Sequence, residues 1–150
     1  MNYRETMSRL NTALNNIDLA YAVIAKKYGL TFNALMTVCL IDEEEKVTQK
    51  KICDVLHLPK STVHSILQDF IKQGYITLVP GSNMKEKFVV FTIEGNKYFS
   101  KIIMETQLFE DRILAVLGED ACAFLVETAE NLGNIIVKEI AEISESEGAV

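Results

Sequence analysis

The chain has 150 residues, of which 49% are hydrophobic and 24% charged, and it carries a formal net charge of −6. A chain of this length buries roughly 70% of its unfolded surface, which is enough for one domain or two small lobes. The composition excludes a disordered chain, and every apolar run is far shorter than the roughly 20 residues that cross a bilayer. The N-terminal residues lack the apolar segment of a secretory signal, so we expect a cytoplasmic protein without a membrane partner.

Positive charge is concentrated in the middle of the sequence. Residues 46–87 contain seven Lys and three acidic residues, a local charge of +4, so the rest of the chain carries −10. A basic central segment between acidic flanks is typical of a DNA-contacting lobe attached to a scaffold that does not touch DNA. A chance fluctuation in surface charge is the weaker alternative.

The first predicted helix has an apolar seam and ends near Gly29. Its apolar residues recur at alternating spacings of three and four, which places them on one side of a helix about three heptads long. A second helix follows, with Thr31 as its N-cap. The seam consists of Met7, Leu10, Leu14, Ile17, Tyr21, Ile24 and Tyr28.

Two short helices joined by a tight turn are predicted next. Thr48 is a natural N-cap for the helix QKKICDVL. The turn contains His57, a residue type that tolerates left-handed backbone better than most. Pro59 fits the first turn of the next helix, because its missing N–H would be unpaired there in any case. This helix lies within LPKSTVHSILQDFIKQ and precedes Gly74.

A hairpin and two long helices complete the pattern. After Gly74 the chain reads YITLV, PGSNMKEK and FVVFT, two β-type runs around a basic tip that is rich in turn residues. Helical patterns then cover about residues 94–117 and 119–144, with Gly118 as the break between them. The apolar stripe of the last helix is too wide for one neighbouring helix, so this helix needs at least two partners.

Helix, helix, short helix, turn, helix and hairpin is the order of elements in a winged helix-turn-helix. We therefore predict a mainly α fold with a small β-hairpin wing, in which the lobe is joined to a helical dimerisation region. The expected parts are an N-terminal dimerisation helix (1–30), a DNA-binding lobe (31–93) and C-terminal dimerisation helices (94–150). The wide apolar stripe and the N-terminal seam both favour a homodimer over a monomeric helical core.

The recognition helix has one apolar and one polar face. A face that enters the major groove must be low and polar, so that the backbone can approach base edges, and Gln68 suits a bidentate contact with adenine. An exposed face is by default only solvated, but here most of its side chains are uncharged where Glu and Lys are usual. The predicted DNA contacts on this helix are Lys60, Ser61, Thr62, His64, Ser65, Gln68 and Lys72.

The stretch VTQKKICDVLHLPKSTVHSILQDFIKQGYI, followed by a wing and FTIEGNKYF, resembles the MarR family of bacterial transcription regulators. The flanking long helices extend this likeness over nearly the whole chain. The resemblance implies intertwined N- and C-terminal helices in a homodimer, two winged lobes on a pseudo-palindromic operator and often a small effector. It therefore implies a sequence-specific regulator that binds double-stranded DNA, which we expect to be a repressor.

The wing departs from the family pattern. The family's wing usually carries an Asp and, two residues on, an Arg that enters the minor groove, and here those positions hold Asn83 and Lys85. Lys is more strongly hydrated than Arg and loses more on entering a narrow groove. We therefore expect weaker wing contacts that reach phosphates only. The predicted contacts of the wing and with phosphates are Lys50, Lys51, Asn83, Lys85 and Lys87.

An effector is expected where the N-terminal region meets the lobe. Tyr21, Tyr28, Phe32 and Met36 fall near this junction, and aromatic residues with polar tips line many small-molecule sites. The ligand would be a small aromatic or amphipathic molecule. Packing within the core is the alternative role for each of these four residues.

An enzyme is not expected. The sequence lacks a Gly-rich phosphate loop, an HExxH motif and a recognisable Ser/His/Asp set. Cys53 and His57 lie four residues apart, but two ligands without a third make a poor metal site, and we expect neither a metal nor a cofactor. The main alternative function is a winged-helix adaptor that binds protein rather than DNA, which would need an exposed apolar patch on the lobe.

Overall fold

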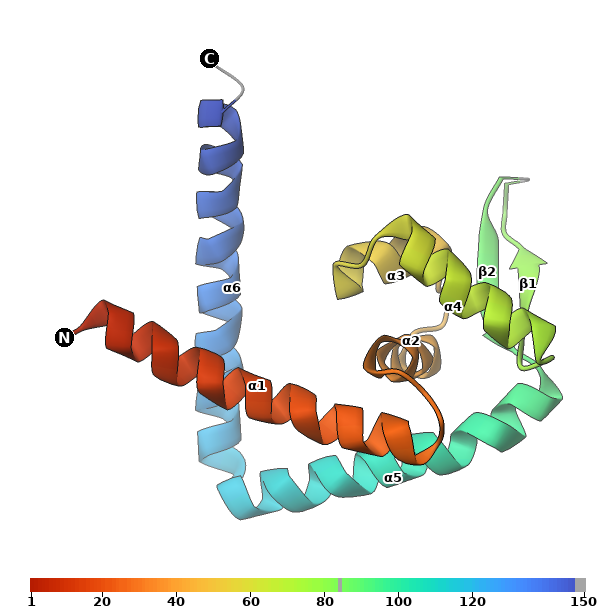
Figure 1. Ribbon diagram of the computed structural model, residues 1–150, viewed down its shortest axis with the longest axis horizontal. Helices are drawn as coiled ribbons and strands as arrows, with labels where there is room; N and C mark the ends of the chain where they lie inside the picture. The colour runs from red at the N-terminus through yellow and green to blue at the C-terminus, as the bar shows by residue number, and fades with distance from the viewer. Residues whose placement is uncertain (84, 148–150) are drawn as a thin grey trace. The chain divides into compact units, whose positions relative to one another are not determined.

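The computed structural model describes residues 1–83 and 85–147, and it divides into an N-terminal unit (Met1–Gln107) and a C-terminal unit (Leu108–Val150). The predicted order of helices and hairpin is confirmed, so the fold is a mainly α winged helix-turn-helix. No helix within the described residues is long and apolar enough to span a bilayer. The elements (Figure 1) are α1 (Tyr3–Lys27), α2 (Phe32–Glu43), α3 (Gln49–Leu56), α4 (Lys60–Lys72), β1 (Ile76–Pro80), β2 (Lys87–Phe91), α5 (Ile93–Leu117) and α6 (Glu119–Glu147).

Helix boundaries in the lobe follow the local chemistry of their caps. The hydroxyls of Thr31 and Thr48 accept the N–H groups of Ala34 and Lys51, as predicted for N-caps. His57 adopts left-handed backbone with φ of 50° at the end of α3. The position of Pro59 is a small correction, because this residue is the N-cap of α4 and lies just before the first helical turn rather than inside it.

The wing is an antiparallel hairpin that pairs Ile76 with Phe91 and Pro80 with Lys87. A third segment joins the sheet, because Val89 donates its N–H to the Val47 carbonyl at 2.7 Å. This bridge ties the loop before α3 to β2, so the wing is held against the lobe. The sequence pattern did not indicate it, since one bridged residue leaves no period-two signal.

Aromatic rings form the centre of the N-terminal unit. Phe99 of α5 is fully buried, and its ring lies 5.1 to 5.5 Å from four neighbouring rings. Edge-on and tilted arrangements at such distances are favourable beyond simple burial. α4 contributes its predicted apolar face to the same core through Val63, Leu67 and Phe70. The neighbouring rings are Phe70, Tyr75, Phe91 and Tyr98.

The start of α5 is fastened to the end of α4 by Thr92. Its hydroxyl donates to the Gly74 carbonyl at 2.6 Å and accepts the Gly95 N–H at 3.0 Å. Gly95 passes so close to the Tyr75 carbonyl that a Cβ atom on it would overlap this oxygen. The direction in which α5 leaves the wing is therefore set by local contacts.

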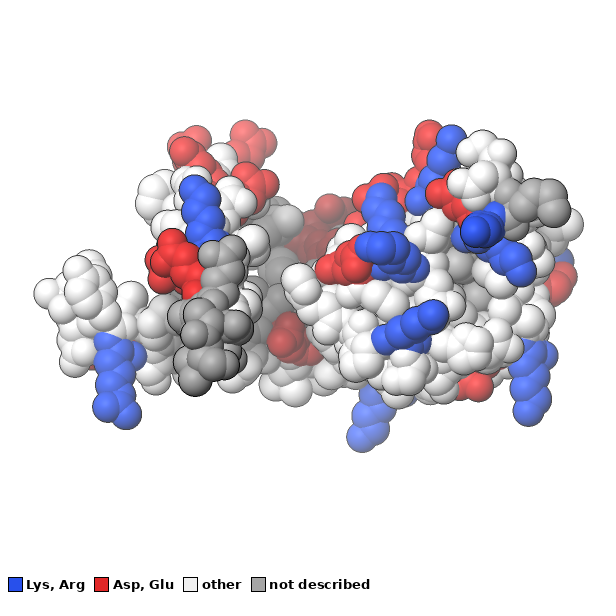
Figure 2. Space-filling view, turned by 90° about the horizontal axis from the view of Figure 1, so that it is seen from above, with Lys and Arg blue, Asp and Glu red and all other residues white. Residues whose placement is uncertain are grey.

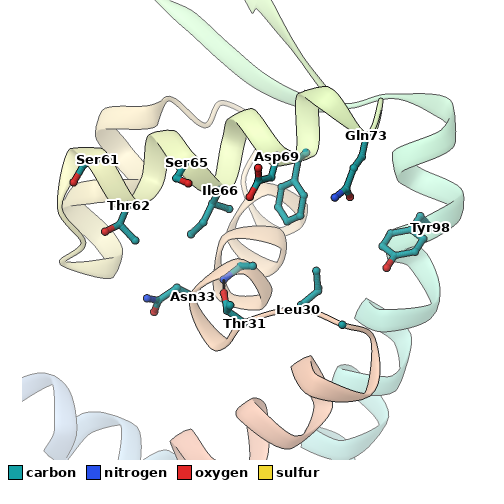
Figure 3. A pocket seen from close by; sticks show the side chains of 13 residues that line it. Leu30, Thr31, Asn33, Ser61, Thr62, Ser65, Ile66, Asp69, Gln73 and Tyr98 are labelled. Atoms are coloured by element: carbon teal, nitrogen blue, oxygen red, sulfur yellow. Dashed lines mark hydrogen bonds between the residues drawn. The ribbon is translucent and has the colours of Figure 1, made fainter.

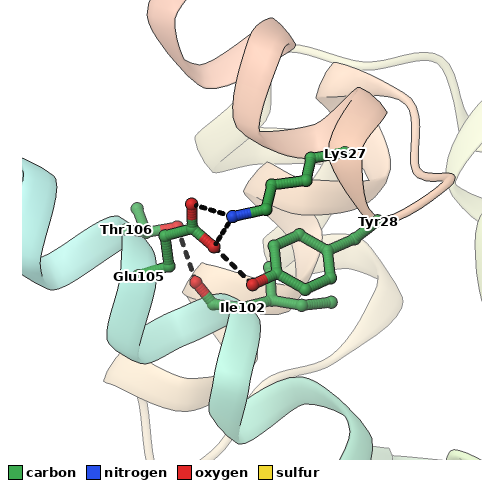
Figure 4. Close-up of polar contacts among 5 residues, drawn as sticks. All are labelled: Lys27, Tyr28, Ile102, Glu105 and Thr106. Atoms are coloured by element: carbon green, nitrogen blue, oxygen red, sulfur yellow. Dashed lines mark hydrogen bonds and ion pairs between the residues drawn. The ribbon is translucent and has the colours of Figure 1, made fainter.

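The end of α1 is fastened to α5 by Glu105. Its carboxylate accepts hydrogen bonds from Lys27 Nζ at 2.6 and 2.8 Å and from the Tyr28 hydroxyl (Figure 4). The hydrogen bond with Glu105 raises the pKa of Tyr28 and of Lys27 above their ordinary values. Tyr98 adds a hydrogen bond from its hydroxyl to the Tyr28 carbonyl at 3.2 Å.

The C-terminal unit contains the end of α5 and α6. Cys122 contacts the preceding helix, with its Sγ 3.6 Å from the Leu114 carbonyl oxygen. Among the described side chains of residues 108–144, none is buried. The predicted apolar stripe of α6 is present but uncovered, as the 71% exposure of Phe124 and the 66% exposure of Val137 illustrate.

Candidate nucleic-acid interface

The polar face of α4 is open to solvent. Its apolar face packs into the core, because Val63, Leu67 and Phe70 are buried, and this fixes the rotation of the helix. Thr62 is half-buried. The other predicted contacts on the helix are all exposed, namely Lys60, Ser61, His64, Ser65, Gln68 and Lys72.

A groove of about 390 Å³ lies between the start of α3, α4 and the wing. Gln68 of α4 lines it together with Lys50, Lys85 and Lys87. Four predicted DNA contacts from three separate elements are thus brought together around one hollow. A base-reading amide flanked by cations combines the two kinds of contact that protein–DNA interfaces use.

The groove also contains two residues that the sequence analysis missed. Gln49 lines it and donates a hydrogen bond from Nε2 to the Lys60 carbonyl at 3.4 Å. Glu86 contributes a carboxylate among the lysines, which opposes a phosphate there. Both lie beside predicted contacts in the sequence, Gln49 next to Lys50 and Glu86 between Lys85 and Lys87. Their position next to these contacts was the sequence feature that could have identified them.

No side-chain hydrogen bond caps the start of α4, because proline at position 59 has no side-chain acceptor. The first backbone N–H groups of a helix have no partner within the helix and carry partial positive charge. Lys60 adds a full positive charge in the same turn. The start of α4 is therefore suited to a phosphate oxygen.

Two of the predicted phosphate contacts are already paired with carboxylates. Lys50 Nζ lies 2.5 Å from an oxygen of Asp54, and Lys51 Nζ lies 2.7 Å from an oxygen of Glu44. The hydrogen bond with Asp54 raises the pKa of Lys50 above its ordinary value. Such exposed pairs are weak, so a phosphate can compete for these lysines. Within residues 1–83 and 85–147, no ion pair engages the remaining candidates Lys60, Lys72, Lys85 and Lys87.

Asn83 shapes the tip of the wing. Its Oδ1 accepts the N–H groups of Lys85 at 3.1 Å and Glu86 at 2.9 Å. This arrangement is an Asx-type turn, in which a side-chain oxygen replaces a backbone acceptor. The oxygen of Asn83 is therefore engaged within the wing, and the residue presents Lys85 to solvent.

Charge on this side of the molecule is interleaved. Figure 2 shows Lys and Arg side chains alternating with Asp and Glu rather than covering one continuous area. The cations of the interface are therefore discrete points, which suits contacts with individual phosphates. In the described part of the chain, no three His, Cys, Asp or Glu side chains form a group that could hold a metal ion.

The four predicted effector residues lie on the second half of α1, just after its end and at the beginning of α2. Tyr28 lines a hollow of about 380 Å³ together with Tyr75 and Tyr98. Tyr21, Phe32 and Met36 are half-buried, so their proposed contact with a ligand stays a prediction.

Comparison with known proteins agrees with this fold. Residues 28–83 match the model of the MarR family, which covers α2, α3, α4 and β1. Over this segment the chain is similar to the MarR family of transcriptional regulators. It is 28% identical over 127 residues to the uncharacterised HTH-type transcriptional regulator YwoH of Bacillus subtilis, covering 79% of this chain and 93% of that protein.

Solved structures of MarR regulators have the same fold. A MarR family regulator from Neisseria meningitidis superposes with a TM-score of 0.80 at 24% identity, over 95% of this chain and 99% of that one. Staphylococcus aureus MarR in complex with salicylate and kanamycin superposes with a TM-score of 0.73 at 16% identity, over 91% of this chain and 93% of that one. At these identities the likeness is one of fold.

Proposed function

We propose that the chain is a homodimeric regulator that binds a pseudo-palindromic operator in double-stranded DNA and represses transcription. The observation that carries this proposal is the groove in which Gln68 lies with Lys50, Lys85 and Lys87. Gln68 is the candidate for reading adenine in the major groove. The lysines and the uncapped start of α4 would hold phosphates and so set the register.

The dimer is proposed from the apolar surface of the C-terminal unit. Exposed side chains such as Phe124, Val137 and Ile140 recur along α6, and a monomer rarely leaves so much contiguous apolar surface in water. A second copy with twofold symmetry would cover the same surface on both chains. Two recognition helices would then lie about 34 Å apart, in successive major grooves.

Regulation by a small molecule is part of the proposal. The S. aureus relative is known in complex with salicylate and kanamycin, which supports an effector for this fold. Binding of an effector would favour a conformation in which the two lobes no longer match the operator. A cytoplasmic location is likewise proposed, because the operator lies there.

Selection of bound duplexes from a random pool, at two salt concentrations, tests the proposal. We expect an enriched palindrome with half-sites one helical turn apart. Affinity should fall steeply with salt, with a log–log slope set by roughly six or more neutralised phosphates per dimer. A flat salt response, or a pool without a shared sequence, would contradict DNA binding by this surface.

Gln68→Ala separates base reading from positioning. The variant should lose on the order of 1 to 3 kcal/mol on the selected duplex and should discriminate less between bases. Gln107→Ala is the matched control, because Gln107 is an exposed glutamine of α5. An equal loss on every duplex would instead assign Gln68 to positioning.

One observation, at the edge of β1, supports the alternative function of an adaptor that binds protein. Leu78 and Val79 of β1 are exposed, and β2 is the one strand paired with β1 among the described residues. An open strand edge beside apolar side chains can add a strand from another protein. On this alternative, Val79→Lys would abolish partner binding, whereas on the DNA-binding proposal the same variant, at a residue outside the lining of the groove, keeps the operator sequence preference.

A further inference from the structure

A cavity of about 680 Å³ lies between the beginning of α2 and the side of α4 that adjoins its DNA-facing strip. Its volume is within the range of sites that bind small molecules. All of its lining belongs to the N-terminal unit, from the loop after α1 to Tyr98 of α5. Ser61, Thr62 and Ser65, which were predicted to contact DNA, also line this cavity.

Polar groups face the cavity from both sides. Figure 3 shows Asp69 of α4 and Gln73, the C-cap of α4, on one side, Thr31 and Asn33 at the start of α2 on the other, and Tyr98 at one end. Among the described residues, no hydrogen bond joins the α4 side chains to those of the α2 side. The polar atoms of these side chains can therefore form hydrogen bonds with a ligand in the cavity.

The charge of the lining is negative. Asp69 is exposed to the cavity, and no Lys, Arg or His is among the lining residues. Thr31 already accepts the Ala34 N–H with its hydroxyl, which weakens the start of α2 as an anion site. A carboxylate without a cation favours a positively charged ligand over an anionic one.

An apolar surface accompanies the polar groups. Leu30 and Ala34 contribute to it from the α2 side, and Ile66 and Phe70 contribute from α4. Apolar lining with a few converging polar groups is the usual composition of a small-molecule site. The occupant should therefore have an apolar body and one charged end.

We propose that this cavity binds a small organic amine. The ammonium group lies against the Asp69 carboxylate, and the apolar body packs on Ile66, Phe70 and Leu30. A hydroxyl on the ligand is matched by the hydroxyl of Ser65 or the amide of Gln73. This site differs from the junction around Tyr28, where the sequence places the effector.

The site is coupled to DNA binding through shared residues, and this second step rests on the proposed function. Ser61 and Ser65 lie both on the exposed strip of α4 and on the cavity. A molecule bound against them places its own atoms beside the surface that would approach the bases. Ligand and operator should therefore weaken each other's binding by the same factor.

Two matched probes test the site in the absence of DNA. Tyramine and 4-hydroxyphenylacetate share a phenol ring and differ in the charge of the side chain. Isothermal titration calorimetry on the full chain should show tyramine binding at least about fivefold more tightly than the carboxylate, the factor that an exposed charge pair can supply. Asp69→Asn should remove this preference, whereas Asp42→Asn, at an exposed carboxylate of α2 outside the cavity, should leave it unchanged.

The outcomes are distinct. Absence of saturable tyramine binding, tighter binding of the carboxylate, or an unchanged preference in Asp69→Asn with a native circular dichroism spectrum would each overturn the proposed site. Repeating the titration with the selected duplex present tests coupling alone. If the chain bound no duplex, the proposed function would fail while the tyramine measurement still decided the site.

Discussion

The core of the N-terminal unit and the C-terminal unit place their large apolar side chains in opposite environments, whereas α1 of the N-terminal unit is itself largely exposed, with Leu19 and Val23 both at 61%. In the N-terminal unit Phe99, Leu35 and Ile52 are fully buried within one chain. In the C-terminal unit no described side chain of residues 108–144 is buried, and Val116 is 90% exposed. α6 carries a long apolar stripe that no residue of its own unit buries.

This contrast separates helices that are stabilised by burial within one chain from helices that need another chain to cover them. Apolar burial contributes roughly 25 cal/mol per Å², and the N-terminal unit gains this contribution from its own residues. α6 gains little from its own chain, and an isolated helix is marginal in water even with good propensity. The proposed second copy would supply the missing burial, so folding of the C-terminal unit should depend on association.

Alanine variants at Phe99 and Phe124 should show the largest difference between the two units, in how their cost in unfolding free energy depends on protein concentration. Phe99→Ala removes a fully buried ring and should cost about 3 to 5 kcal/mol of unfolding free energy. Phe124→Ala removes a ring that is 71% exposed in the single chain, so its cost should come from weaker association. Urea denaturation at several protein concentrations distinguishes the two.

The effect of Phe124→Ala should grow as the protein is diluted, because dissociation accompanies unfolding. The effect of Phe99→Ala should stay nearly constant over the same concentrations. If Phe124→Ala lost several kcal/mol in a chain that sedimented as a monomer, α6 would be covered within one chain and the contrast between the units would be wrong.

Gly95→Ala tests the rigid joint between wing and α5. The added Cβ would overlap the Tyr75 carbonyl oxygen, and the chain must shift to relieve the contact. Overpacking of this kind costs about 1 to 3 kcal/mol. Thermal unfolding should show the loss, and Gly133→Ala in α6, where a Cβ has open space, should be neutral or stabilising. Equal stability of the two variants would mean that the close approach of Gly95 to the Tyr75 carbonyl does not hold the start of α5 against the wing.

Most of the fold could be predicted because its signals are local. Thr31 and Thr48 were recognisable as caps, His57 as a left-handed residue, and the stripe on α6 as a wide apolar surface, from side-chain type and spacing alone. The bridge from Val47 to Val89 could not be predicted. It joins residues far apart in sequence through one backbone hydrogen bond, which leaves no periodic pattern.

The candidate site was predictable in its helix and less so in its surroundings. The rotation of α4 follows from its apolar face, so the exposure of Gln68 was expected. Sequence spacing could not show that Thr62 and Ser65 turn toward a cavity beside Asn33, because that depends on how α2 packs. The turn formed by Asn83 could not be predicted for another reason. An amide at this position could equally contact DNA or accept backbone N–H groups within the wing.

Raising the pH should weaken the contact between α1 and α5. The pKa values of Lys27 and Tyr28 are raised above 10.5 and 10.0 by the hydrogen bonds with Glu105. Protons are therefore held more tightly in the folded state, and the stabilisation is complete below about pH 10 and is lost as the pH rises further. Between about pH 9 and pH 11, the wild type should lose more unfolding free energy than Glu105→Gln.

The control for this measurement is Glu94→Gln, which removes an exposed pair with Lys97 on the same helix. Exposed pairs contribute little, so this variant should follow the wild type across the alkaline range. Parallel curves for wild type and Glu105→Gln would mean that Glu105 does not hold the end of α1.

The smallest expected effects concern two left-handed residues, one in each unit. His57 has φ of 50° and Gly118 has φ of 89°. Residues other than glycine are strained in such backbone conformations. His57→Gly should therefore stabilise the N-terminal unit by up to about 1 kcal/mol, because relief of strain outweighs the entropy that glycine adds to the unfolded chain. Gly118→Ala should destabilise the C-terminal unit by a similar amount, since a Cβ there meets open space and the backbone conformation alone opposes it. Denaturation at high protein concentration, where the proposed dimer persists, measures both. The opposite sign at His57 would mean that its side chain makes a stabilising contact that outweighs the backbone strain.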